Sequence, residues 1–93
     1  MSDNIRMHLI ITGRVQGVCF RIATKKEAEK YKIFGWVKNK KDGTVEAVFE
    51  GEKQKVDSMI NWCRQGPPGA DVLKLDLELE SFTAEFNRFK IIY

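Results

Sequence analysis

Hydrophobic and polar positions follow two different patterns in the first third of this chain. Residues 7–12 form an apolar run with several β-branched side chains, and the run ends at Gly13. A short run of this kind favours a strand. Residues 22–32 instead place apolar side chains at helical spacing, with lysines and glutamates between them. This pattern predicts an amphipathic helix that follows the strand.

The middle of the chain predicts a hairpin and a second helix. Phe34–Asn39 and Thr44–Glu50 are strand-like runs, and the segment between them ends in Asp-Gly, which is typical of a tight hairpin turn. A helix is predicted over about residues 53–64. Its apolar stripe consists of Val56, Met59, Ile60 and Cys63.

The last third of the chain predicts a loop and two more strands. The loop is Gly66-Pro67-Pro68-Gly69, because proline cannot continue a helix. Beyond it, leucines at 73, 75, 77 and 79 alternate with charged residues at 74, 76, 78 and 80. Such alternation predicts a strand with one solvated face. Phe89–Tyr93 is predicted to be a final short strand.

The predicted order is therefore β-α-β-β-α-β with an additional short C-terminal strand. One-sided alternation favours an antiparallel sheet with both helices on one face, which is the ferredoxin-like α/β sandwich of the α+β class. At 93 residues, residues 1–93 are expected to form a single domain.

Charge is distributed unevenly along the chain. Residues 1–41 carry 10 Lys and Arg against 3 Asp and Glu, whereas residues 42–93 carry 6 against 10. A basic half of this kind fits steering of a small anion, binding of nucleic acid, or simply a solvated basic face. Charge alone does not decide among the three.

The sequence shows neither the apolar segments of a targeting signal nor the residue spacing of a metal site. The longest apolar run is far shorter than the ~20 residues of a membrane helix, and the N-terminal residues do not resemble a signal peptide. We therefore expect a cytoplasmic protein without a membrane partner. Cys19, Cys63 and the single histidine, His8, have no metal-ligand spacing, so no metal site is expected.

The stretch from Gly13 to Arg21 predicts an anion-binding loop. Glycine permits left-handed backbone and close approach to a ligand, and consecutive N–H groups in such a turn can surround an anion. The expected cap positions of the following helix, Val18 to Phe20, lack a capping side chain. The first helical N–H groups are therefore expected to be open to an anion, unless the helix is capped later, at Thr24.

Two stretches of the chain, residues 13–21 and 35–51, resemble the paired signatures of the acylphosphatases. The resemblance extends to the Gly66-Pro67-Pro68 loop and to the closing strand. It implies a small hydrolase of carboxyl-phosphate anhydrides that has the ferredoxin-like fold and needs no cofactor or metal. Its partner would be a small-molecule acyl phosphate, with inorganic phosphate as product or inhibitor, and the protein would act as a monomer.

The resemblance also implies a site. Arg21 corresponds to the family's phosphate-binding arginine and Asn39 to its water-positioning asparagine, so these two are the expected catalytic residues. The substrate phosphate is expected to bind to Arg21 and to the backbone N–H groups of the loop. The loop residues concerned are Gln16, Gly17, Val18, Cys19 and Phe20. Two positions depart from the family pattern, and neither of them is Arg21 or Asn39. Cys19 stands at a variable position, and Lys32 replaces a glycine that is frequent in the family.

Three other functions fit the sequence less well. A cysteine-dependent phosphatase needs arginine six positions after the cysteine, but Lys25 and Gly69 stand there. An RNA-binding module of the same fold is disfavoured because residues 44–50 lack the basic, glycine and aromatic signature and carry two acids. A carbamoyl-phosphate-handling relative within a larger assembly would need partner domains. His8 is expected to be structural.

Overall fold

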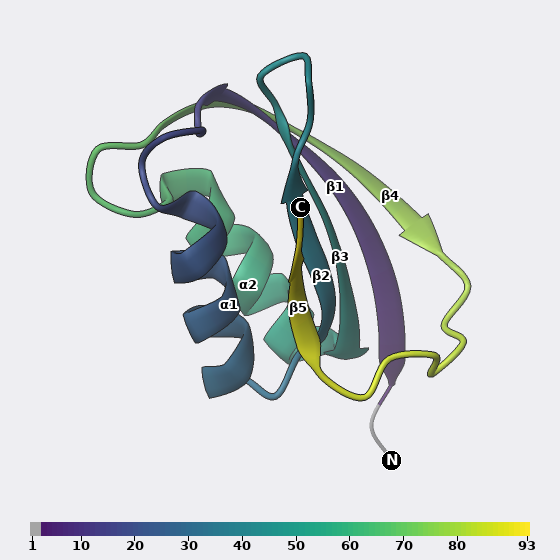
Figure 1. Ribbon diagram of the computed structural model, residues 1–93. Coiled ribbons are helices and arrows are strands. Elements are labelled where there is room, and N and C mark those ends of the chain that lie inside the picture. Colours follow the sequence, from purple (N-terminus) through teal and green to yellow (C-terminus); the bar gives the residue numbers. More distant parts are fainter. Residues whose placement is uncertain (1–2) are drawn as a thin grey trace.

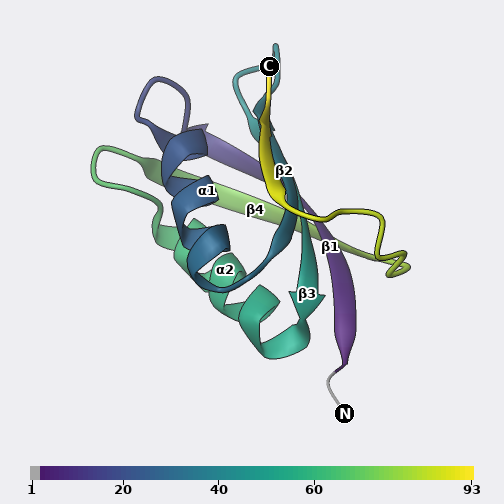
Figure 2. The same ribbon diagram turned by 60° about the horizontal axis from the view of Figure 1, so that its bottom comes forward.

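The computed structural model describes residues 3–93 as two layers, with both helices on one face of a five-stranded sheet (Figures 1 and 2). The elements are β1 (Asn4–Arg14), α1 (Phe20–Lys30), β2 (Phe34–Asn39), β3 (Val45–Glu52), α2 (Lys53–Gln65), β4 (Asp71–Glu80) and β5 (Phe89–Ile92). Their order confirms the predicted ferredoxin-like α+β fold. In residues 3–93, neither helix is long and apolar enough to cross a membrane.

The sheet is mixed, so the prediction of a wholly antiparallel sheet is wrong. The strand order is β4-β1-β3-β2-β5, and every neighbouring pair is antiparallel except β2 with β5, which is parallel. The reason is the path of the chain. β4 ends at the end of the sheet where β2 begins, and residues 81–88 then carry the chain to the free side of β2 (Figure 1).

The core lies between the sheet and the helices, as the periodicity predicts. From the sheet it contains fully buried side chains such as Leu9, Ile11 and Phe49. The predicted stripe of α2 is buried along its whole length, including Met59 and Cys63. Burial raises the pKa of the Cys63 thiol well above its ordinary value, so Cys63 is an inert packing residue.

The leucine side of β4 is much less buried than its alternation suggests. Leu75 packs against the core, but Leu73, Leu77 and Leu79 are 73%, 42% and 65% exposed. β4 is an edge strand, and an irregularity in its pairing with β1 places Val72, not Leu73, opposite Gly13 and against the core. The charged side of β4, with Lys74, Asp76 and Glu78, is exposed as predicted.

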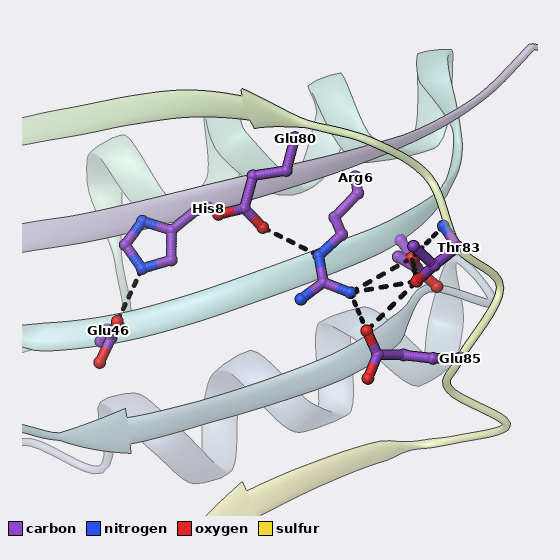
Figure 3. A network of polar contacts seen from close by, with 7 residues as sticks. Arg6, His8, Glu46, Glu80, Thr83 and Glu85 are labelled. Atoms are coloured by element: carbon purple, nitrogen blue, oxygen red, sulfur yellow. Dashed lines mark hydrogen bonds and ion pairs between the residues drawn. The ribbon is translucent and has the colours of Figure 1, made fainter.

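Residues 81–88 are fastened to the face of the sheet opposite the helices by a polar network centred on Arg6 (Figure 3). Arg6 Nε donates to Glu80 at 2.9 Å, and its Nη1 contacts Glu85. Thr83 donates its backbone N–H to Glu50 at 3.1 Å. Glu50 is only 2% exposed, so a buried carboxylate anchors the crossover between the last two strands.

Candidate active site

The loop between β1 and α1 has the left-handed backbone that its sequence predicts. Gly17 has a φ of 76° and Cys19 a φ of 63°. A non-glycine residue in this region is uncommon, and Cys19 adopts it at the N-cap of α1. The chain therefore takes left-handed backbone at two positions directly before the helix.

The start of α1 leaves several backbone donors open. The helix begins at Phe20, two residues earlier than predicted, so Arg21 lies in its first turn. Cys19 caps the helix without a side-chain hydrogen bond. Thr24, the alternative cap, lies inside the helix and donates its hydroxyl to the Phe20 carbonyl at 2.7 Å. The N-terminal N–H groups and the helix dipole at this point favour an anion.

The β2–β3 hairpin presents the second predicted catalytic residue. Asn39 is the last residue of β2 and lies opposite Val45. The turn beyond it is stabilised by Asp42, which accepts hydrogen bonds from the Thr44 hydroxyl at 2.6 Å and the Thr44 N–H at 3.0 Å. These bonds from Thr44 hold the pKa of the Asp42 carboxyl below its ordinary value. The hairpin is thus a well-defined support for Asn39.

Gln16 joins the loop to the hairpin. Its side-chain amide donates to the Lys40 carbonyl at 2.7 Å and to the Thr44 carbonyl at 2.9 Å. These two carbonyls flank the turn that follows Asn39. The Gln16 side chain therefore couples the position of the anion-binding loop to that of Asn39.

Arg21 and Asn39 line one cavity of about 270 Å³. The Oδ1 atom of Asn39 is buried and has no hydrogen-bond partner among residues 3–93. Buried polar atoms are almost always hydrogen-bonded, so this oxygen lacks the donor that such an atom usually has. The guanidinium of Arg21 lies 5.1 Å from the centre of the Tyr93 ring, and no acidic group in residues 3–93 forms an ion pair with it. Among the described residues, the cavity lining therefore combines an arginine without an ion-pair partner and an asparagine whose amide oxygen has no donor.

The remaining predicted loop residues divide into two groups. Gly17, Cys19 and Phe20 line the cavity with Arg21 and Asn39. Val18 does not line the cavity and instead packs against the core. The Gln16 side chain is hydrogen-bonded to the hairpin. Sequence reasoning assigned Gln16 only a backbone role and missed its side chain. The contact of Tyr93 with Arg21 was also missed, because only the parallel pairing of β5 with β2 brings the C-terminus to the site.

His8 lies outside this cavity, on the face of the sheet opposite the helices (Figure 3). Its Nε2 atom is 2.6 Å from Glu46 Oε2. Partial burial opposes ionisation of Glu46, but the hydrogen bond to His8 and the nearby charges outweigh it and lower the pKa of the Glu46 carboxyl. His8 therefore forms part of a surface polar pair between β1 and β3, in keeping with its expected structural role.

Comparison with known proteins agrees with the geometry. The acylphosphatase family model matches residues 7–91. The chain is 44% identical to an acylphosphatase of Pelotomaculum thermopropionicum, over 95% of this chain and 96% of that protein. It is 49% identical to one of Syntrophus aciditrophicus, over 95% and 92%. The crystal structure of acylphosphatase from Bacillus subtilis superposes with a TM-score of 0.92 at 36% identity, covering 96% and 99% of the two chains. The chain therefore belongs to the acylphosphatase family, hydrolases of the carboxyl-phosphate bond.

Proposed function

We propose that this cavity binds the phosphoryl group of a small-molecule acyl phosphate and hydrolyses it without a metal or cofactor. Arg21 and the backbone N–H groups of residues 16–21 hold the phosphoryl oxygens, and Asn39 positions the attacking water. The observation that carries the proposal is that Arg21 and Asn39 line one cavity, where within residues 3–93 Arg21 has no acidic partner and the buried Asn39 Oδ1 has no donor.

The proposed roles match the demands of the reaction. An acyl phosphate is already activated, so positioning and charge stabilisation can be sufficient for hydrolysis. The planar guanidinium of Arg21 can contact two phosphoryl oxygens at once. The Asn39 amide can accept a hydrogen bond from water through Oδ1 and donate one through its NH₂ group. Water attacks phosphorus, the bond from phosphorus to the bridging oxygen breaks, and the carboxylate leaves.

The substrate itself is the proposed proton acceptor. Within residues 3–93, no histidine or carboxylate lines the cavity, and Asn39 is not basic enough to deprotonate water at neutral pH. A phosphoryl oxygen can take the proton of the attacking water, which gives inorganic phosphate and the free carboxylate. If the rate instead titrates with a protein group near neutrality, and His8→Gln removes that titration, this step is incorrect.

The acyl group is proposed to lie toward the β2–β3 hairpin. A second, more open hollow shares Asn39 with the cavity and is lined by Lys38, Lys40, Lys41, Asp42 and Tyr93. Its lysines give this side a positive character, and the Tyr93 ring gives it an apolar surface. Both features suit a carboxylate leaving group as it departs with a developing negative charge.

We also propose that one chain is the complete active unit and that it works in the cytoplasm. Arg21, Asn39 and the loop residues that line the cavity lie together within one chain, which supports the predicted monomer. Cys19 and Cys63 are both free thiols, which fits a reducing compartment. A nucleic acid partner is not proposed, because the sheet face that would receive it carries Glu46, Glu50 and Glu80.

The decisive test compares an aromatic acyl phosphate with an aryl phosphate monoester as substrates. We expect rapid hydrolysis of the acyl phosphate only, with inorganic phosphate as a competitive inhibitor because it occupies the same loop. Equal cleavage of both compounds would contradict the proposal, since a monoester needs leaving-group assistance that this cavity does not provide. Inhibition by phosphate that is not competitive would separate the loop from the reaction site.

A further inference from the structure

His8 carries an imidazole that the catalytic site does not use. It lies on β1, on the face of the sheet opposite the helices, and its Nε2 atom is 2.6 Å from Glu46 Oε2 of β3 (Figure 3). β4 pairs with the other side of β1 and places Glu78 directly opposite His8. His8, Glu78 and Glu80 each bring one possible ligand atom to within 4.8 Å of the others. An imidazole and two carboxylates thus come together from two strands.

The contact with Glu46 fixes which nitrogen of His8 carries a proton. Partial burial of Glu46 is outweighed by its hydrogen bond to His8 and by nearby charges, which lower the pKa of its carboxyl. Glu46 is therefore ionised at neutral pH and can only accept, so the proton is assigned to Nε2 and Nδ1 of a neutral imidazole keeps its lone pair. Nδ1 points away from Glu46, toward β4 (Figure 3), and forms no hydrogen bond within residues 3–93. Three acceptors thus face one another, an arrangement that a metal cation stabilises.

We propose that His8 Nδ1, Glu78 and Glu80 bind one divalent transition-metal ion, such as Zn²⁺, which fastens the edge strand β4 to β1. Imidazole nitrogen and carboxylate oxygen bind Zn²⁺ at about 2.0–2.2 Å. Two donors at that distance from one ion lie about 3–4 Å apart, so a small rotation of the exposed Glu78 side chain closes the site. Water completes the coordination on the solvent side.

Glu46 supplies the outer contact that a metal-binding histidine usually has. Such a histidine donates its other N–H to a carboxylate, which orients the ring and raises its basicity. The contact of His8 Nε2 with Glu46 has this form, and Lys38 Nζ lies 3.6 Å from Glu46 Oε1. Arg6 Nε donates to Oε1 of Glu80, so Oε2 is left for the ion. The imidazole is therefore already oriented for a ligand role.

The charge of this face also favours a cation. The whole chain has a net charge of +3, but carboxylates outnumber the cations around His8. The cations that form ion pairs there are Arg6 and Lys38, and the carboxylates are Glu46, Glu50, Glu78, Glu80 and Glu85. This face therefore attracts a cation although the protein as a whole is basic.

The proposed ion has a structural role. The ligands are far apart in the sequence, and only the pairing of β1 with β4 brings them together, so no metal-ligand spacing marks them in the sequence. The cavity with Arg21 and Asn39 does not include them. We therefore expect the ion to stabilise the fold, and the proposed hydrolysis does not depend on it.

Titration with Zn²⁺ tests the site. His8 is the single histidine of the chain, so its imidazole NMR signals report on this site directly. The titration is run on the wild-type chain and on Cys19→Ser, which lacks the exposed thiol as an alternative ligand. In both we expect a saturable shift of the Nδ1 signal and a higher midpoint of thermal unfolding. Unchanged imidazole signals up to about 1 mM Zn²⁺, or an unchanged midpoint, would overturn the proposal.

Two matched substitutions on β4 separate coordination from general charge. Glu78→Gln keeps the size of a ligand but removes its charge, and we expect it to weaken Zn²⁺ binding by about tenfold or more. Asp76→Asn is the control, because it removes the same charge from the same face, where Asp76 Oδ2 lies 3.6 Å from Lys74 Nζ. Both positions are exposed, so both variants should fold. Equal effects of the two substitutions would mean an adventitious ion only and would overturn the site.

Discussion

The Gln16 side-chain amide donates a 2.7 Å hydrogen bond to the Lys40 carbonyl and so connects the anion-binding loop to the hairpin that carries Asn39. A second bond from the same nitrogen to Thr44 O, at 2.9 Å, closes the connection on the other side of the turn. The two proposed catalytic residues thus lie on different elements, and the hydrogen bonds of Gln16 connect these elements. Gln16 is a positioning residue and does not itself line the cavity.

Gln16→Ala is expected to lower kcat by about tenfold to a hundredfold, because a misplacement of ~1 Å in a reacting geometry costs on this order. KM should change less, since Arg21 and the loop N–H groups remain. Steady-state kinetics with an aromatic acyl phosphate measures both parameters. Gln54→Ala, on the exposed side of α2, is the matched control and should leave them unchanged. A Gln16 variant that changes KM alone would assign this side chain to substrate binding.

Arg21→Lys is expected to weaken phosphate binding by about tenfold or more although the charge is kept, because an ammonium lacks the two-pronged geometry of a guanidinium. The inhibition constant of inorganic phosphate measures this effect directly. Arg64→Lys makes the same chemical change on the exposed last turn of α2 and should have no effect. Unchanged phosphate inhibition in Arg21→Lys would remove Arg21 from the phosphate site.

Asn39→Ala is expected to lower kcat by at least about a hundredfold while the unfolding free energy stays constant or rises. Removing the catalytic amide costs turnover on the scale of a lost transition-state donor. It also removes a buried oxygen without a partner, a kind of atom that costs about 1–3 kcal/mol. Urea denaturation and kinetics test the two effects separately, with exposed Asn61→Ala as control. A kcat within about threefold of the wild-type value would contradict the proposed catalytic role of Asn39.

Treatment with a chelator is expected to leave activity unchanged. His8, Glu78 and Glu80 are close enough together to hold a cation, but they lie on the sheet face opposite the helices, and the cavity with Arg21 does not include them. Activity assays before and after EDTA, followed by addition of a divalent ion, test this point. Loss of activity that the ion restores would contradict the metal-independent mechanism.

The stability of the protein is expected to fall at acid pH, partly through Glu46. Its folded-state pKa is below the ordinary value of 4.5, so its contribution is present above that value and is lost as pH falls through the folded-state pKa. Glu46→Gln should therefore flatten the acid side of the curve of unfolding free energy against pH. Glu27→Gln is the control, because Glu27 has no ion pair among residues 3–93. Parallel curves for wild type and Glu46→Gln would exclude this contribution.

Patterns in the sequence were sufficient for the elements, and signature motifs predicted two residues that line one cavity. Helix α2 and strand β2 occur almost where their periodicity places them, because burial of one face imposes a repeat of 3.6 or 2 residues on the local sequence. Arg21 and Asn39 were found through signature motifs. The hairpin was also predictable, since Asp-Gly specifies a turn whatever lies around it.

Only the tertiary structure decided how distant segments meet. The pairing of β5 with β2 in parallel depends on the route of residues 81–88, which are held in place by Arg6 and Glu50. The exposure of Leu79 depends on the place of β4 at the edge of the sheet. The hydrogen bonds of Gln16 depend on where the hairpin lies. Periodicity is a local property of the chain, whereas these contacts join residues 24 to 79 positions apart. Their partners therefore follow from the path of the whole chain.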